Sequence, residues 1–241
     1  MPDMIKPQGD KAVLTGEVIH MSRLPVPTQQ DLPDLLAAAL DACEVPSAHL
    51  TSDLLGIQFF QTGRFQTVLD DPAAGLPVAL HMISWLANKP ATRTADPAFP
   101  IPIRVAVALG PVQFLDGKVN LFDQVSRRSF RGGGKAFFQS SRLLETMRRG
   151  DRRIALHTPW FDTNAEFQVT CRFLDHHIKR WSADQASTIL ALLRQEKQKE
   201  TAQALGISQS AVAQRFQRAG GPAIKAMLRR YSKIAENNVR R

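Results

Sequence analysis

The segment Arg127–Lys135 combines basic side chains with three consecutive glycines ahead of an expected helix. Backbone N–H groups exposed by such a segment can bind an anion, and basic side chains add hydrogen bonds to phosphate oxygens. The segment lacks the GxxxxGK[ST] spacing of a P-loop. It would therefore hold the phosphates of a nucleotide or of a DNA backbone, or else be an ordinary surface loop. The expected phosphate-binding residues are Arg127, Arg128, Arg131, Gly132, Gly133, Gly134 and Lys135.

The spacing of the other reactive side chains does not indicate metal or nucleophilic chemistry. His176 and His177 are adjacent, so on a helix they point in different directions and are poorly placed to share a metal ion. Cys43 and Cys171 lie far apart without the spacing of a zinc site, and two cysteines suit a reducing compartment. We therefore expect neither a metal nor a cofactor.

The segment Gln198–Gly220 has the pattern of a helix-turn-helix. Gly206 allows the positive φ of a sharp helix-ending turn, and Ser208 is a good N-cap for a second helix. Leu205 is expected in the core at the end of the first helix. The second helix would bind the major groove, where Gln and Ser side chains hydrogen-bond to base edges and basic side chains bind phosphates. The expected DNA-binding residues are Lys199, Ser208, Gln209, Ser210, Ala213, Gln214, Arg215, Gln217 and Arg218.

The distribution of charge supports a polyanionic partner. The net charge is +9, and residues 179–241 hold 13 Lys and Arg against 4 Asp and Glu, whereas residues 1–178 hold 18 of each kind. A basic module on a neutral body is typical of proteins that bind nucleic acid, although a solubilising surface has the same composition. No apolar run is long enough for a membrane helix, so we expect no membrane partner and a cytoplasmic, nucleoid-associated protein.

The order of elements predicts two domains. Residues 1–178 alternate expected strands and helices, among them a strand at Lys11–Ile19, two short strands within His49–Phe60 and a buried strand at Ile101–Gly110. Residues 179–241 read as helix only, and Ser182 with Gln185 forms a capping box. The predicted fold is α+β: a ferredoxin-like sheet domain over residues 1–178, followed by an all-α helix-turn-helix domain over residues 179–241.

Two family resemblances follow from these residues. Leu205-Gly-Ile-Ser208 with Val212, Arg215, Phe216 and Ala219 resembles region 4 of sigma factors. More broadly, the chain resembles the SatD family of bacterial proteins. That resemblance rests on TGEVIHMSR (Thr15–Arg23), IRVAVALG (Ile103–Gly110), GGKAFFQSSRLLETM (Gly133–Met147) and the residues Leu174, Asp175, Trp181, Gln185 and Ala186.

The SatD resemblance implies that the first domain is similar to the palm of class III nucleotide cyclases. Cyclases hold two Mg²⁺ ions with one Asp on the first strand and one at the central hairpin, and Mg²⁺ prefers such oxygen ligands. The matching positions here are Glu17, in place of the first Asp, and Asp53, which lacks the usual preceding glycine. We therefore interpret the site as degenerate and expect no enzymatic activity; Glu17 and Asp53 would be the metal ligands of an active enzyme.

The sequence as a whole predicts a bacterial transcriptional regulator. Its C-terminal domain would read double-stranded DNA, and its N-terminal domain would dimerise the chain or sense a nucleotide or small-molecule effector. Two alternatives stay open. One is a metal-dependent, cyclase-like enzyme with a DNA-binding tail, and the other is an adaptor whose helix-turn-helix binds protein.

Overall fold

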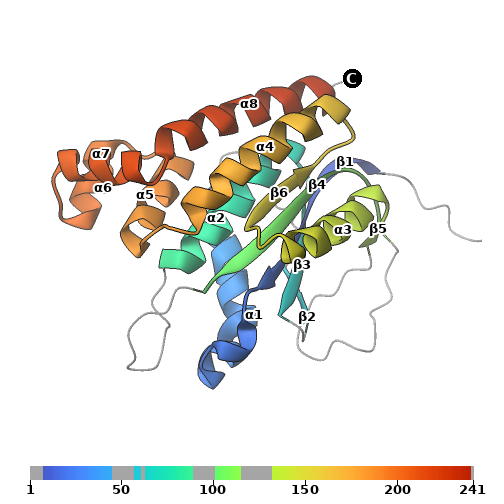
Figure 1. Ribbon diagram of the computed structural model, residues 1–241, viewed down its shortest axis with the longest axis horizontal. Coiled ribbons are helices and arrows are strands. Elements are labelled where there is room, and N and C mark those ends of the chain that lie inside the picture. The colour runs from blue at the N-terminus through green and yellow to red at the C-terminus, as the bar shows by residue number, and fades with distance from the viewer. Residues whose placement is uncertain (1–7, 45–56, 61–62, 89–100, 115–131, 240–241) are drawn as a thin grey trace, which may run out of the picture.

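The protein is built on one mixed β-sheet with helices on both faces (Figure 1). Its structure, a computed structural model, describes residues 8–44, 57–60, 63–88, 101–114 and 132–239. The strands are β1 (Gln8–Val18), β2 (Gln58–Phe60), β3 (Arg64–Leu69), β4 (Ile103–Phe114), β5 (Gly132–Gly133) and β6 (Ile154–His157). The helices are α1 (Val26–Asp41), α2 (Gly75–Asn88), α3 (Lys135–Arg149), α4 (Phe161–Ile178), α5 (Ala183–Leu193), α6 (Gln198–Leu205), α7 (Gln209–Arg218) and α8 (Gly221–Val239).

The sheet has the strand order of a ferredoxin-like palm. The strands β2, β3, β1 and β4 are neighbours in that order, and each pair is antiparallel. The chain then passes through α3 and returns as β6, which pairs in parallel with β4. The short β5 pairs with the far end of β4. The predicted α+β architecture, a palm-like sheet domain followed by helices, is confirmed.

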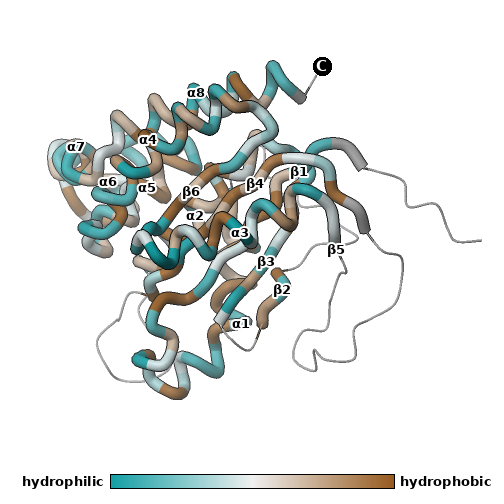
Figure 2. Tube along the Cα trace, turned by 45° about the vertical axis from the view of Figure 1, so that its right-hand side comes forward, coloured by the Kyte–Doolittle hydropathy of each residue, from teal (hydrophilic) through white to brown (hydrophobic). Residues whose placement is uncertain are grey.

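Alternate side chains of a strand point to opposite faces of the sheet, and the two faces pack against different helices. On β1, Ala12 and Leu14 belong to the large core that includes residues of α1, α2, α4 and α8. Between them, Val13 points to the opposite face and packs with Ala136 and Phe137 of α3. The same alternation runs along β4, so α3 covers one face and the other helices gather on the second face. The hydrophobic stretches of Figure 2 accordingly concentrate in the central strands.

Helix α2 lies in the middle of the core. Every residue from Gly75 to Leu86 is buried, which is the pattern of a helix that packs on all sides. One side lies against β1 and β4, and another lies against α5 and α8. Ser187 of α5 donates a hydrogen bond to Asn88 at 2.7 Å and so fixes the end of α2.

The C-terminal helices share this core with the sheet. Tyr231 of α8 is buried, its hydroxyl donates to the carbonyl oxygen of Pro72, and its ring meets Phe167 of α4 edge-on at 5.8 Å. Gly75 packs so closely there that an added Cβ would lie 2.9 Å from Ala12, Tyr231 and Val107. The hydrophobic cluster therefore continues across the predicted boundary at residues 178 and 179, and that boundary stays a prediction.

Two details of the predicted elements differ from the structure or lie outside it. Strands were expected within His49–Phe60, whereas the central hairpin consists of β2 and β3 and turns between Phe60 and Arg64. Residues 49–56 lie outside the described ranges. Among the described helices, none combines the length and apolar character that a bilayer-crossing segment needs.

Replacement of Tyr231 tests whether α8 belongs to the core. We expect Tyr231→Ala to lower the free energy of unfolding by about 3–5 kcal/mol, because it leaves a cavity between α8, α4 and the sheet. Tyr231→Phe should cost about 1 kcal/mol, because the Pro72 carbonyl loses its donor. Urea denaturation of the full chain measures both values. The control is Phe138→Ala, which removes a 65% exposed ring and should change stability by less than about 0.5 kcal/mol. An equal effect of Tyr231→Ala and the control would contradict this packing.

Candidate functional sites: a helix-turn-helix and a carboxylate among arginines

Helices α6 and α7 form the predicted helix-turn-helix. Gly206 ends α6 with a φ of 64°, the left-handed conformation that glycine adopts without strain. The side chain of Ser208 then caps α7 by accepting a hydrogen bond from the backbone N–H of Ala211 at 3.2 Å. Val212 is buried between the helices, and Ala202 is buried where α6 approaches α7.

The start of α8 and the end of α4 position α7. The ring of Phe216 fills the space beside Gly221, where an added Cβ would lie 2.1 Å from it. Gly220, with a φ of 79°, packs against the ring of His177 at the end of α4. Trp181 donates its indole N–H to the carbonyl oxygen of Ala219 at 3.0 Å. Helix α7 is therefore held by the body of the protein as well as by α6.

Most of the predicted DNA-binding side chains lie exposed on this motif, and their role stays a prediction. Exposed are Lys199, Ser208, Gln209, Ser210, Gln214, Gln217 and Arg218, whereas Ala213 and Arg215 are half-buried. Arg215 forms an ion pair with Asp184 of α5 at 2.8 Å, so in this structure it fastens α7 to α5.

The prediction for Leu205 is wrong. Leu205 was expected in the core, but its side chain is 38% exposed. Leu205 is the last residue of α6, and the chain leaves that helix through the left-handed turn at Gly206. Ile207 is half-buried, and its backbone N–H donates to the carbonyl oxygen of Ala202.

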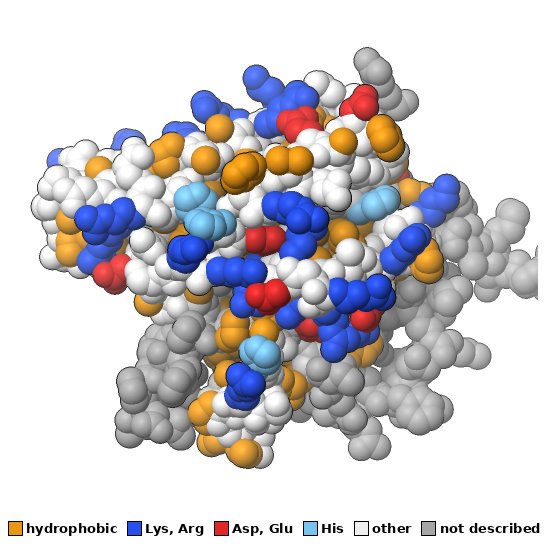
Figure 3. All heavy atoms as spheres, in the orientation of Figure 1, with side chains coloured by type: hydrophobic (Ala, Val, Ile, Leu, Met, Phe, Trp, Pro, Cys, Tyr) orange, Lys and Arg blue, Asp and Glu red, His pale blue; other side chains and the backbone are white. Residues whose placement is uncertain are grey.

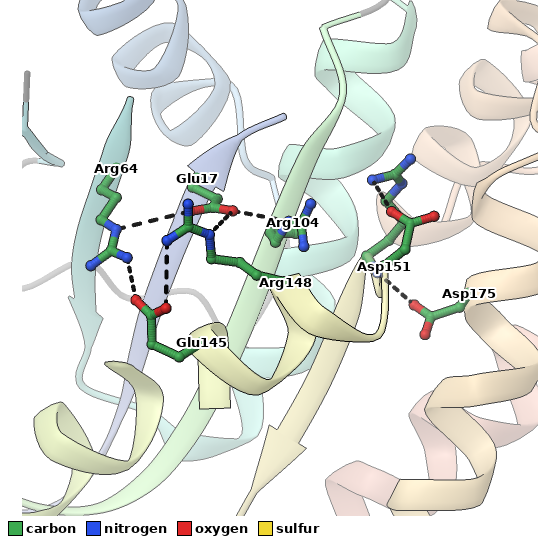
Figure 4. A network of polar contacts seen from close by, with 8 residues as sticks. Glu17, Arg64, Arg104, Glu145, Arg148, Asp151 and Asp175 are labelled. Atoms are coloured by element: carbon green, nitrogen blue, oxygen red, sulfur yellow. Dashed lines mark hydrogen bonds and ion pairs between the residues drawn. The ribbon is translucent and has the colours of Figure 1, made fainter. Parts of the chain in front are cut away.

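Glu17 lies at the end of β1 and is surrounded by guanidinium groups (Figure 4). The sheet register places it opposite Arg64 of β3 on one side and opposite Arg104 of β4 on the other. Its carboxylate lies 3.2 Å from Arg104 Nε, 3.2 Å from Arg148 Nε of α3 and 3.9 Å from Arg64 Nε. Glu145 of α3 joins the cluster through ion pairs with Arg64 and Arg148.

The cluster contains a buried cation, Arg104, whose positive charge is balanced by the carboxylate of Glu17. Arg104 is only 7% exposed, and its Nη1 finds no hydrogen-bond partner among the described residues. Burial lowers the pKa of Arg104 below its ordinary value, and the neighbouring Glu17 carboxylate counteracts that effect. The hydrogen bond from Arg64 lowers the pKa of Glu145. Glu17 therefore supplies negative charge to the buried Arg104, whereas Arg64 and Arg148 also form ion pairs with Glu145.

These residues do not fit the metal that the cyclase resemblance implies. A Mg²⁺ site needs carboxylate oxygens free to bind the ion, but Glu17 already contacts three guanidinium groups. Arg64, which directly follows the turn of the central hairpin, lies opposite Glu17. Asp53, the second expected ligand, lies outside the described residues. Among those residues, no group of three or more His, Cys, Asp and Glu side chains could hold a metal ion.

One sequence signal could have indicated this cluster. Arg104 is the one charged residue in the apolar run Ile103–Gly110, and a buried strand rarely carries a charge without an opposite partner.

The buried Asp175 of α4 also has a structural role. It accepts hydrogen bonds from the backbone N–H groups of Arg153 and Ile154, both at 2.9 Å, and so joins α4 to the start of β6.

Only part of the glycine-rich segment lies in the described ranges. Gly132 and Gly133 form β5, Gly134 precedes α3 with a φ of 104°, and Lys135 is exposed at the start of that helix. Arg127, Arg128 and Arg131 lie outside those ranges. Phosphate binding by this segment stays a prediction.

Comparison with known proteins concerns the fold alone. Neither a family model nor a curated protein matches the chain. A bacterial light-regulated adenylyl cyclase matches with 15% identity and a TM-score of 0.45 over 65% of this chain, which spans less than half of that structure's chain, 45%. The guanylate cyclase domain of RhGC from Catenaria anguillulae, in complex with GTP, matches with 16% identity and a TM-score of 0.43, covering 58% of this chain and 75% of that one. The guanylyl cyclase Cya2 matches with 12% identity and a TM-score of 0.43, covering 59% and 72%.

These matches correct one expectation. The expectation that the chain is not an enzyme is withdrawn, because the matched structures named above, which are similar to it in fold, are adenylyl or guanylyl cyclases. The matches support neither the SatD resemblance nor a DNA partner, and both stay predictions.

Removal of Glu17 tests its role as the partner of a buried cation. We expect Glu17→Ala to lower the free energy of unfolding by roughly 3–5 kcal/mol, because Arg104 is left buried without its carboxylate. Glu145→Ala is the matched control and should cost about 1 kcal/mol or less, since its side chain is 45% exposed. Thermal and urea denaturation of the full chain give both values. Equal, small effects of the two variants would show that Arg104 does not depend on Glu17.

Proposed function

We propose that this protein binds double-stranded DNA through α7, as a transcriptional regulator whose palm-like domain carries the helix-turn-helix. The observation that carries the proposal is the geometry of α6 and α7: a left-handed glycine turn, a capped second helix and an exposed face of Gln, Ser and Arg side chains. Gln209 and Gln214 would hydrogen-bond to base edges, and Arg218 would contact a phosphate.

Charge supports the same function. The net excess of nine positive charges lies within residues 179–241, which include the two helices of the motif. Binding that neutralises phosphates releases counterions, so affinity should fall steeply as salt rises. Directly after α7, Gly220 packs against His177 and Ala219 accepts a hydrogen bond from Trp181, so the palm-like domain would set the orientation of the recognition helix.

Selection of binding sites from a random duplex library, followed by variants of α7, tests the proposal. Gln214→Ala with Arg218→Ala should weaken binding to the selected site by roughly tenfold or more, because a good base contact is worth about 1–3 kcal/mol. The loss of Arg218 should also reduce the slope of affinity against salt by about 1. Fluorescence anisotropy with labelled duplex measures both quantities.

The matched control replaces the same residue types away from the motif. Gln30→Ala with Arg23→Ala changes exposed residues near the N-terminal end and should leave both affinity and salt slope unchanged. The proposal fails if no sequence is enriched, or if the α7 variant binds as tightly as the unchanged protein.

A second candidate is an enzyme that acts on nucleotides in the palm-like domain. The observation that favours it is the strand order β2-β3-β1-β4, with Glu17 at the end of the first strand, where the cyclase resemblance has its first carboxylate. The arginines around Glu17 would have to move before that carboxylate could contact a ligand. Fold alone does not decide activity, so this candidate needs a direct assay.

Incubation with each nucleoside triphosphate and Mg²⁺ or Mn²⁺, with product analysis by chromatography, tests the enzyme. An active site at Glu17 should give a cyclic or oligomeric product that is absent with Glu17→Gln, a variant that keeps the shape of the side chain. Glu145→Gln, in the same cluster, controls for general disturbance and should keep the activity. The absence of product with every triphosphate would eliminate this candidate.

A further inference from the structure

The outer face of α4 carries an apolar stripe. Phe161, Val169 and Phe173 are 84%, 55% and 72% exposed, and Ala165, also exposed, completes a row with a spacing of four residues. Residues four apart lie on one face of a helix, so these side chains form a continuous surface. Figure 3 shows hydrophobic side chains in a row over the position of α4. Scattered exposed apolar residues are ordinary, but a contiguous stripe indicates an interaction surface.

The charges beside the stripe indicate what covers it. Asp162 lies near the start of α4, and Arg172 lies ten residues further along the helix. Neither forms an ion pair with any residue that the structure describes. Glu166, the other exposed acidic residue of α4, is held by Arg230 of α8 at 3.0 Å. A parallel copy of α4 would place like charges at the same level, whereas an antiparallel copy places each charge level with its opposite.

The stripe is self-complementary in that antiparallel arrangement. A twofold axis at the level of Phe167 brings Phe161 of one copy level with Phe173 of the other, and Ala165 level with Val169. The same axis brings Asp162 level with Arg172. This pattern is the requirement of an isologous interface, in which one patch pairs with itself. We propose that α4 is the dimer interface of this protein and that a second copy of the chain covers its apolar stripe.

The position of α7 fits such a dimer on DNA. His177, which contacts Gly220 just after α7, lies ten residues beyond Phe167 along the chain. At 1.5 Å per residue, the two His177 residues of an antiparallel pair lie about 30 Å apart along the helices. Recognition helices that enter successive major grooves need a separation of about 34 Å. The twofold axis also keeps both α7 helices on the same side of the pair. The use of the dimer on DNA rests on the proposed function, whereas the dimer itself does not.

Sedimentation velocity of the full chain over a range of concentrations tests the interface. The unchanged protein should dimerise, and Val169→Glu should raise the dissociation constant of the dimer by roughly tenfold or more, as expected for a central interface residue. Phe138→Glu, which places the same charge at a 65% exposed aromatic position of α3, is the matched control and should dimerise normally. Circular dichroism verifies that each variant keeps its helices.

A charge exchange tests the antiparallel register. Asp162→Arg alone and Arg172→Asp alone should each weaken the dimer, because each places like charges at one level. The two changes together should restore it. The proposal is overturned if the chain stays monomeric at every concentration, if Val169→Glu dimerises normally, or if the double exchange does not rescue. A dimer through α4 that binds no DNA would sink the proposed function alone, and a monomer that binds a single half-site would sink the interface alone.

Discussion

The complete burial of α2 is the constraint on which the rest of the structure depends. A helix without an exposed side between Gly75 and Leu86 must be covered all round, and the sheet can cover only one side of it. Helices α1, α5 and α8 supply the remaining cover. Because α5 also packs on α7, the packing that buries α2 and completes the core also determines the position of α7.

The two faces of the sheet differ in chemistry. The face that meets α2 is apolar. The face under α3 carries Thr15 and Glu17, and α3 adds Ser140 and two members of the Glu17 cluster, Glu145 and Arg148. Thr15 and Ser140 join through their hydroxyls at 2.7 Å, and Glu17 continues the polar row toward the end of β1. Polar side chains on this face come from three strands and one helix, so they depend on the register of the whole sheet.

Local patterns in the sequence predicted much of the fold. The capping box of Ser182 and Gln185, the glycine turn at Gly206 and the Ser208 cap are all present, because each depends on residues within a few positions. The Glu17 cluster could not be predicted in the same way, because Arg64, Arg104 and Arg148 come from distant segments that only the strand register brings together. The central hairpin was misplaced for a similar reason: the short β2 is defined by its pairing with β3 rather than by its own composition.

The seat of α7 against α4 has a consequence for modularity. Gly220 fits against His177, Trp181 binds Ala219, and Tyr231 reaches Pro72 beside the sheet. A helix-turn-helix attached in this way is not an independent module, because its orientation depends on contacts with the rest of the protein. Transplanted to another protein, α6 and α7 would lose the surfaces of α5, α8 and the end of α4 that orient them. If α7 binds DNA as proposed, new specificities would arise by exchange of side chains on α7 in place, rather than by recombination of whole segments.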